Sequence, residues 1–100
     1  MGTPTDYLYD VSINENFLTF SYKIHDSPDS QWWAIYRGVM PSWEYINKDK
    51  LYWNWISYND EKNKTGTITH NYDFNRGEIY TVALFLNINW GLADYREIIA

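Results

Sequence analysis

The chain has 100 residues, which fits one domain and is close to the size of a two-sheet sandwich. Its net charge is −5, and its eight Lys and Arg residues are dispersed, so it lacks the basic surface that a nucleic-acid ligand requires. No stretch approaches the ~20 apolar residues of a membrane span. Aromatic residues make up 20% of the chain, enough ring area for a substantial core without any cysteine.

Residues 1–5, Met-Gly-Thr-Pro-Thr, have the composition of a linker. We therefore expect a single β-sandwich module over residues 6–100 that belongs to a longer, modular protein. Because Thr-Pro linkers are common between modules of extracellular enzymes, this start also favours secretion.

The first segments alternate with a period of two, which is typical of half-buried antiparallel strands. Residues 7–13 and 17–24 predict two such strands, joined by a short turn at residues 14–16. The expected inward face of the first strand is Tyr7, Tyr9, Val11 and Ile13. The expected inward face of the second strand is Leu18, Phe20, Tyr22 and Ile24.

The middle of the chain predicts further strands at residues 31–37 and 51–58, with a short piece at residues 43–46 between them. Trp32 and Trp33 must lie on opposite faces, whereas Trp53 and Trp55 share one face. Three more strands follow at residues 65–72, 78–87 and 92–99. The pattern predicts an all-β, antiparallel two-sheet sandwich of seven or eight strands with no substantial helix.

The order of aromatic and glycine positions resembles a known pattern. The residues that carry it are Trp32 to Gly38, Ser42 to Tyr45, Gly66-Thr67 and Gly77 to Asn87. They are similar to immunoglobulin-like or fibronectin-like accessory modules of bacterial extracellular carbohydrate-active enzymes, and more faintly to SKICH domains. The resemblance implies a β-sandwich and says little about function. The chain departs from the pattern at Trp33 and Ala34.

Six tryptophans are more than a small sandwich core can bury, because that core is about 10 Å thick and each indole brings on the order of 200 Å² of surface. We expect at least two of them to be exposed, and exposed aromatic patches are typical of binding surfaces. Indole faces stack on the C–H face of a pyranose ring. The sequence therefore favours a sugar ligand.

The candidate ligand-binding residues are aromatic side chains spaced along strands or loops, together with amides that can bond to sugar hydroxyls. They are Trp53, Trp55, Trp90, Trp32, Tyr36, Trp43, Asn54 and Asn89, with Gln31, Asn87 and Glu44 as further neighbours. Several alternatives stay open. Trp53 and Trp55 could both face the core, Trp43 could have a structural role, and Trp90 could fold over the end of the sandwich.

Catalysis and metal binding have weaker signals. His25 and His70 are isolated, and no nucleophile motif or zinc spacing occurs, so we expect no enzyme activity and no cofactor. The carboxylates that could form a catalytic pair are Asp6, Asp10, Glu44, Glu78, Asp94 and Glu97. The acidic residues that could hold a structural calcium ion are Asp26, Asp29, Asp60, Glu61 and Asp73, although their spacing is not that of a calcium loop.

We therefore expect a secreted, monomeric, non-catalytic carbohydrate-binding module of a modular enzyme or cellulosome. Its ligand is predicted to be a β-linked plant-type polysaccharide of the β-glucan, mannan or xyloglucan class, with no nucleic acid or membrane partner. The alternative is an immunoglobulin-like structural spacer or a protein-recognition domain.

Overall fold

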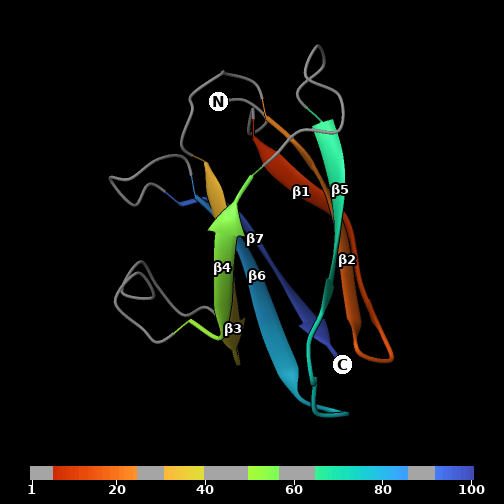
Figure 1. Cartoon of the computed structure of the whole chain (residues 1–100). Coiled ribbons are helices and arrows are strands. Elements are labelled where there is room, and N and C mark those ends of the chain that lie inside the picture. Colours follow the sequence, from red (N-terminus) through yellow and green to blue (C-terminus); the bar gives the residue numbers. More distant parts are fainter. Residues whose placement is uncertain (1–5, 25–30, 40–49, 57–64, 86–91) are drawn as a thin grey trace.

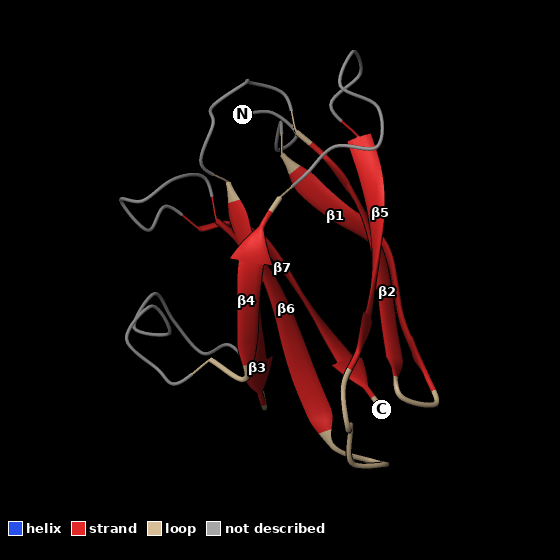
Figure 2. Ribbon diagram, viewed as in Figure 1, coloured by secondary structure: helices blue, strands red, loops and turns tan. Residues whose placement is uncertain are grey.

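The computed structural model describes residues 6–24, 31–39, 50–56, 65–85 and 92–100. Within these ranges the chain forms seven strands and no helix (Figure 2). All strand pairs are antiparallel and lie in two sheets (Figure 1). The predicted all-β sandwich is confirmed.

The two sheets contain three and four strands. In sheet order, the smaller sheet consists of β1 (Tyr7–Asn14), β2 (Phe17–Lys23) and β5 (Thr65–Asn71). In sheet order, the larger sheet consists of β4 (Tyr52–Trp55), β3 (Trp32–Arg37), β6 (Ile79–Phe85) and β7 (Leu92–Ile99). Strands β4 and β5 are therefore edge strands, and β3 and β6 form the middle of the larger sheet.

The main core lies between the two sheets. The inward residues of β2 are buried as the alternation predicted, and Phe20 contacts Trp33 of the opposite sheet with ring centroids 5.0 Å apart. Strand β6 is covered on both faces, because Tyr80, Val82 and Leu84 face the main core while Ala83 and Phe85 belong to a second cluster on the outer face. This double burial accounts for the continuous apolar sequence of the strand.

Strand β1 differs from the prediction. Its alternation is interrupted by a β-bulge between Tyr9 and Ser12, where Asp10 has a positive φ of 54°. Because the bulge inserts one extra residue, Leu8 before it is buried in the core and Val11 within it packs against the same core. The expectation of one inward face from Tyr7 to Ile13 was therefore wrong for Tyr7 and Tyr9, since Leu8 takes the inward position.

Some predicted segments are shorter in the structure or lie outside it. Among the described residues, Leu51 and Ile56 of the predicted 51–58 segment lie outside β4, and β6 begins at Ile79, one residue later than predicted. Residues 57–58 and 86–87 of the predicted segments are outside the described part of the chain. The linker at 1–5 and the short piece at 43–46 fall outside the described residues. Strand β5 is an edge strand, as its Thr-rich sequence predicted.

Two hydrogen bonds fix how the sheets and turns meet. The backbone N–H of Leu8 in β1 donates to the Asp94 Oδ2 atom in β7 at 2.8 Å, which ties the two sheets together at one side. The backbone N–H of Asn75 donates to the hydroxyl of Tyr80 at 2.8 Å. Tyr80 is near the start of β6, and its hydroxyl bonds to the backbone five residues upstream. This arrangement is called a tyrosine corner and is a hallmark of immunoglobulin-like sandwiches.

Replacing Tyr80 with Phe tests this corner. The variant keeps the buried ring and removes the acceptor of the Asn75 N–H, so it should lose about 1 kcal/mol of unfolding free energy. Urea denaturation should show a lower midpoint with an unchanged slope. The control is Tyr95→Phe, which removes a hydroxyl from an exposed ring. Equal stability of the Tyr80→Phe variant and the unmodified protein would contradict the structural role.

Candidate functional site

The outer face of the larger sheet carries most of the tryptophans that the structure describes. Side chains alternate along a strand, so the inward position of Trp33 places Trp32, Ala34 and Tyr36 of β3 on the outer face. The register sets Trp55 opposite Trp32 and Trp53 opposite Ala34. Residues directly opposite each other in a sheet project from the same face, so all three tryptophans share this surface.

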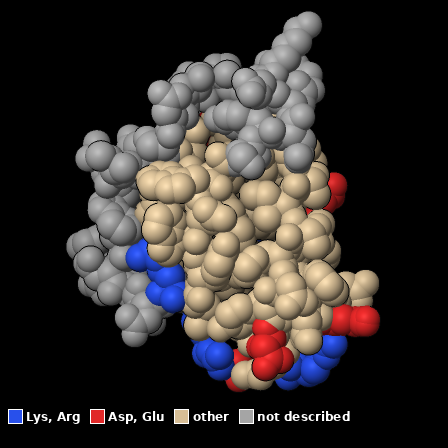
Figure 3. Space-filling view, viewed as in Figure 1, with Lys and Arg blue, Asp and Glu red and all other residues tan. Residues whose placement is uncertain are grey.

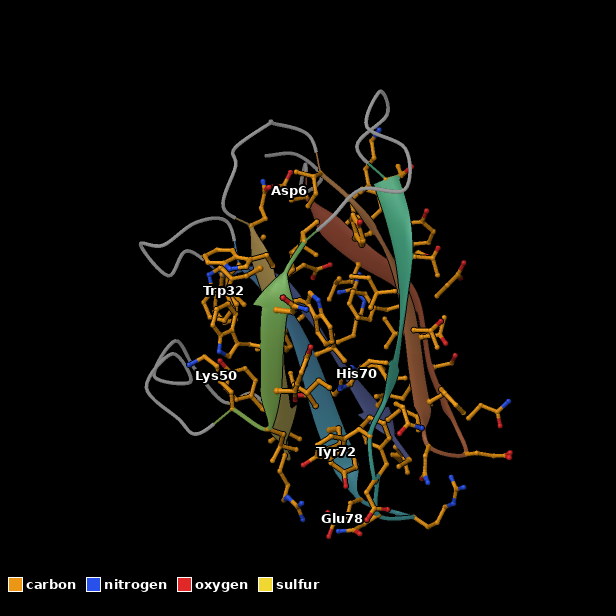
Figure 4. The ribbon with its side chains drawn as sticks, in the orientation of Figure 1. Asp6, Trp32, Lys50, His70, Tyr72 and Glu78 are labelled. Carbon is orange, nitrogen blue, oxygen red and sulfur yellow. The ribbon has the colours of Figure 1, made fainter. Side chains whose placement is uncertain are left out.

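A buried aromatic layer lies at the base of this surface. Trp32 stacks on Phe85 of β6, with ring centroids 4.0 Å apart and an interplanar angle of 13°. The Lys50 ammonium lies 5.6 Å from the Trp32 ring centroid, within range of a cation–π contact. Figure 4 shows both Trp32 and Lys50 on the outer side of this sheet. We name the Trp32–Phe85 stack, together with Tyr36, the aromatic base.

Burial corrects two of the predicted ligand contacts. Trp32 is only 5% exposed and Tyr36 only 1% exposed. Rings this deeply covered have no face to offer a ligand. We therefore assign Trp32 and Tyr36 a structural role in the aromatic base, in place of the stacking role that their spacing suggested.

Trp53 and Trp55 are the exposed part of this surface. Each is 47% exposed, and their ring centroids are 5.4 Å apart. Their planes meet at 85°, so the two rings make an edge-to-face contact. The planes of Trp53 and Trp32 also meet steeply, at 76°, with centroids 5.8 Å apart. The exposed rings are therefore adjacent, but they do not lie in one plane.

Other predicted site residues lie elsewhere. Asn54 is opposite Trp33 in the register and so lies on the inward side of β4. Its side chain is nevertheless exposed, and its amide bonds only within β4: it donates to the Tyr52 hydroxyl at 3.2 Å and accepts the Trp55 backbone N–H at 2.8 Å. Gln31 is buried. The residues outside the described part of the chain are Trp43, Glu44, Asn87, Asn89 and Trp90.

A second aromatic group contains His70, which the sequence analysis treated only as an isolated histidine. Its ring stacks on Tyr52 of the opposite sheet, with centroids 4.0 Å apart, and makes an edge contact with Trp33. Figure 4 shows His70 between the sheets. Burial lowers the pKa of His70 below its usual 6.5. The sequence signal that indicates an inward position for His70 is its spacing of two residues from Ile68, on the same face of β5.

Some charged side chains form ion pairs in the described part of the chain. Arg37 pairs with Glu78 at 2.9 Å, and Arg96 pairs with Asp94 at 2.6 Å. Figure 3 shows charged groups gathered mainly toward the lower end of the molecule, below a broad uncharged area. Two of the carboxylates considered for catalysis, Glu78 and Asp94, are therefore held in ion pairs.

No metal site emerges from the residues that the structure describes, since they contain no group of three or more His, Cys, Asp or Glu that could hold an ion. Of the predicted calcium ligands, Asp73 is described, whereas Asp26, Asp29, Asp60 and Glu61 lie outside the described ranges. Within these ranges there is also no helix long and apolar enough to cross a bilayer.

Comparisons of the chain with models of protein families, with curated proteins and with solved structures gave no match. The site must therefore be interpreted from its own geometry. Its distinctive feature is the half-exposed pair Trp53 and Trp55, which the aromatic base supports from below.

The His70 group predicts a pH dependence of stability. Because the folded protein lowers the pKa of His70, the unfolded chain binds a proton more readily, and stability should fall as the pH drops below about 6.5 toward the folded-state pKa. A His70→Phe variant keeps an aromatic ring and removes the titration. Chemical denaturation at about pH 7.5 and about pH 5 should therefore show a smaller loss for the variant. An identical loss in both proteins would show that His70 does not cause the dependence.

Proposed function

We propose that the protein is a non-catalytic carbohydrate-binding module that holds neutral sugars against Trp53 and Trp55. The observation that carries this proposal is the pair of half-exposed indoles at adjacent outer positions of β4. A pyranose has an apolar C–H face that packs on an indole, and each indole also carries one N–H donor for a sugar hydroxyl. The two side chains therefore offer both kinds of contact that a sugar needs.

The size of the exposed pair favours a small ligand over a protein partner. Two half-exposed indoles present on the order of 200 Å², whereas a stable protein interface buries about 800 Å² on each partner. One sugar ring can cover the smaller area. The aromatic base also holds Trp53 in place before binding, which reduces the conformational entropy that binding would otherwise cost.

The charge of the chain supports a neutral ligand. The net charge is −5, so an anionic polymer such as a nucleic acid would be repelled. We extend the proposal to a β-linked plant-type polysaccharide of the β-glucan, mannan or xyloglucan class. The protein would then act as a secreted, monomeric module beside catalytic or other modules, without a cofactor of its own.

A second candidate function is a structural spacer or protein-recognition domain, and one observation favours it. Ile79 and Ile99 are opposite each other in the β6–β7 register and are 38% and 65% exposed. The exposed Val39 follows Gly38, whose N–H donates to the Ile79 carbonyl. This apolar group could contact a neighbouring domain. It would predict partner binding that depends on Ile99 and not on Trp53.

Replacing Trp53 or Trp55 with Ala tests the sugar proposal. Each change removes stacking area, so binding should weaken at least about tenfold. Affinity electrophoresis in gels that contain glucomannan, xyloglucan or hydroxyethylcellulose would measure the loss of retardation. The matched control is Tyr9→Ala, which removes a ring that is 40% exposed on the smaller sheet and should bind like the unmodified protein.

The same gels separate the candidate functions. Undiminished retardation of both Trp variants would place the sugar site elsewhere. Absence of retardation on every polysaccharide, together with association that an Ile99→Ser variant abolishes, would favour protein recognition. Release of reducing sugar from any of these polymers would contradict the non-catalytic assignment.

A further inference from the structure

We propose that Trp53 and Trp55 form a corner that recognises one sugar ring at a chain end or branch, and not consecutive units of a flat chain. This inference rests on the proposed function and specifies its ligand. Its starting observation is that the two planes meet at 85° while the ring centroids are only 5.4 Å apart.

The angle decides which ligand shape fits. Consecutive units of a flat β-linked chain present their faces to a surface in one direction, so two indoles can stack on them together only if the indole planes are nearly parallel. With perpendicular planes, a sugar ring that stacks on one indole meets the other indole with its rim. The pair therefore encloses a single ring on two sides.

The larger sheet holds the corner in this shape. Trp53 contacts Trp32 as well as Trp55, and Trp32 is stacked on Phe85 of the neighbouring strand. Turning Trp53 to make it coplanar with Trp55 would break both edge-to-face contacts. The ring of Trp53 is thus held by a neighbour that is itself buried, so this wall of the corner has its orientation before a ligand arrives, and Trp55 contacts it edge-to-face.

The inward side of β4 also fixes the position of the corner. Tyr52 stacks on His70 of the smaller sheet, and Asn54 accepts the backbone N–H of Trp55. The Tyr52–His70 stack ties the strand that carries both walls to the smaller sheet, whereas the Asn54 bond is local to β4. A strand that is paired with β3, contacts the smaller sheet and carries two perpendicular rings is suited to recognising the shape of one sugar.

Calorimetric titration with β-1,4-linked glucose and mannose oligomers, from the disaccharide to the hexasaccharide, tests this inference. If the corner holds one terminal ring, affinity should change by no more than about twofold along each series. An affinity that rises more than about tenfold with length would show that several units bind in succession, which would overturn the corner and leave the sugar function intact. Absence of binding to every oligomer and polysaccharide would overturn both.

Two variants complete the test. Trp55→Ala removes one wall of the corner and should weaken binding of the disaccharide at least about tenfold, whereas Tyr9→Ala should bind it as tightly as the unmodified protein. If Trp55→Ala retains full affinity for the disaccharide while Trp53→Ala loses it, a single indole is the binding surface, and the corner is wrong. Circular dichroism checks that both Trp variants are folded.

Discussion

The stack of Trp32 on Phe85 is the contact on which the outer surface depends. It joins β3 to β6 on the side of the larger sheet that faces away from the core, with ring centroids 4.0 Å apart. Without it, Trp53 would have no buried ring to contact from below. The protein thus uses one tryptophan of its central strand as internal support, and the exposed indoles of the edge strand take their orientation from that support.

The middle strands of the larger sheet connect two apolar layers. Trp33 and Ile35 face the main core, whereas Trp32 and Tyr36 face outward and are equally well buried. A strand that is covered on both faces has little freedom to shift its register, because a slip of one residue would exchange the two layers. Because β4 pairs with β3, the fixed register of β3 also determines the position of β4.

Strand β4 is an edge strand whose inward side makes contacts within the protein and whose outward side carries exposed indoles. On the inward side, Tyr52 contacts His70 of the smaller sheet, and Asn54 bonds to its own strand. On the outward side are the half-exposed Trp53 and Trp55. Edge strands are usually the least constrained part of a sheet, and here contacts from both sheets restrain the strand that bears the candidate site. The binding proposal depends on that restraint.

Outside β1, the sequence alone indicated where the strands lie and which residues share a face, because alternation with a period of two follows from the geometry of an extended chain. It placed Trp32 and Trp33 on opposite faces and Trp53 with Trp55. Periodicity does not state which face is covered, so only the packing of the sheets decided that Trp32 and Tyr36 are buried. The bulge at Asp10 leaves no periodic signal, and the angle between Trp53 and Trp55 depends on Trp32 and Phe85, which lie far away in the sequence.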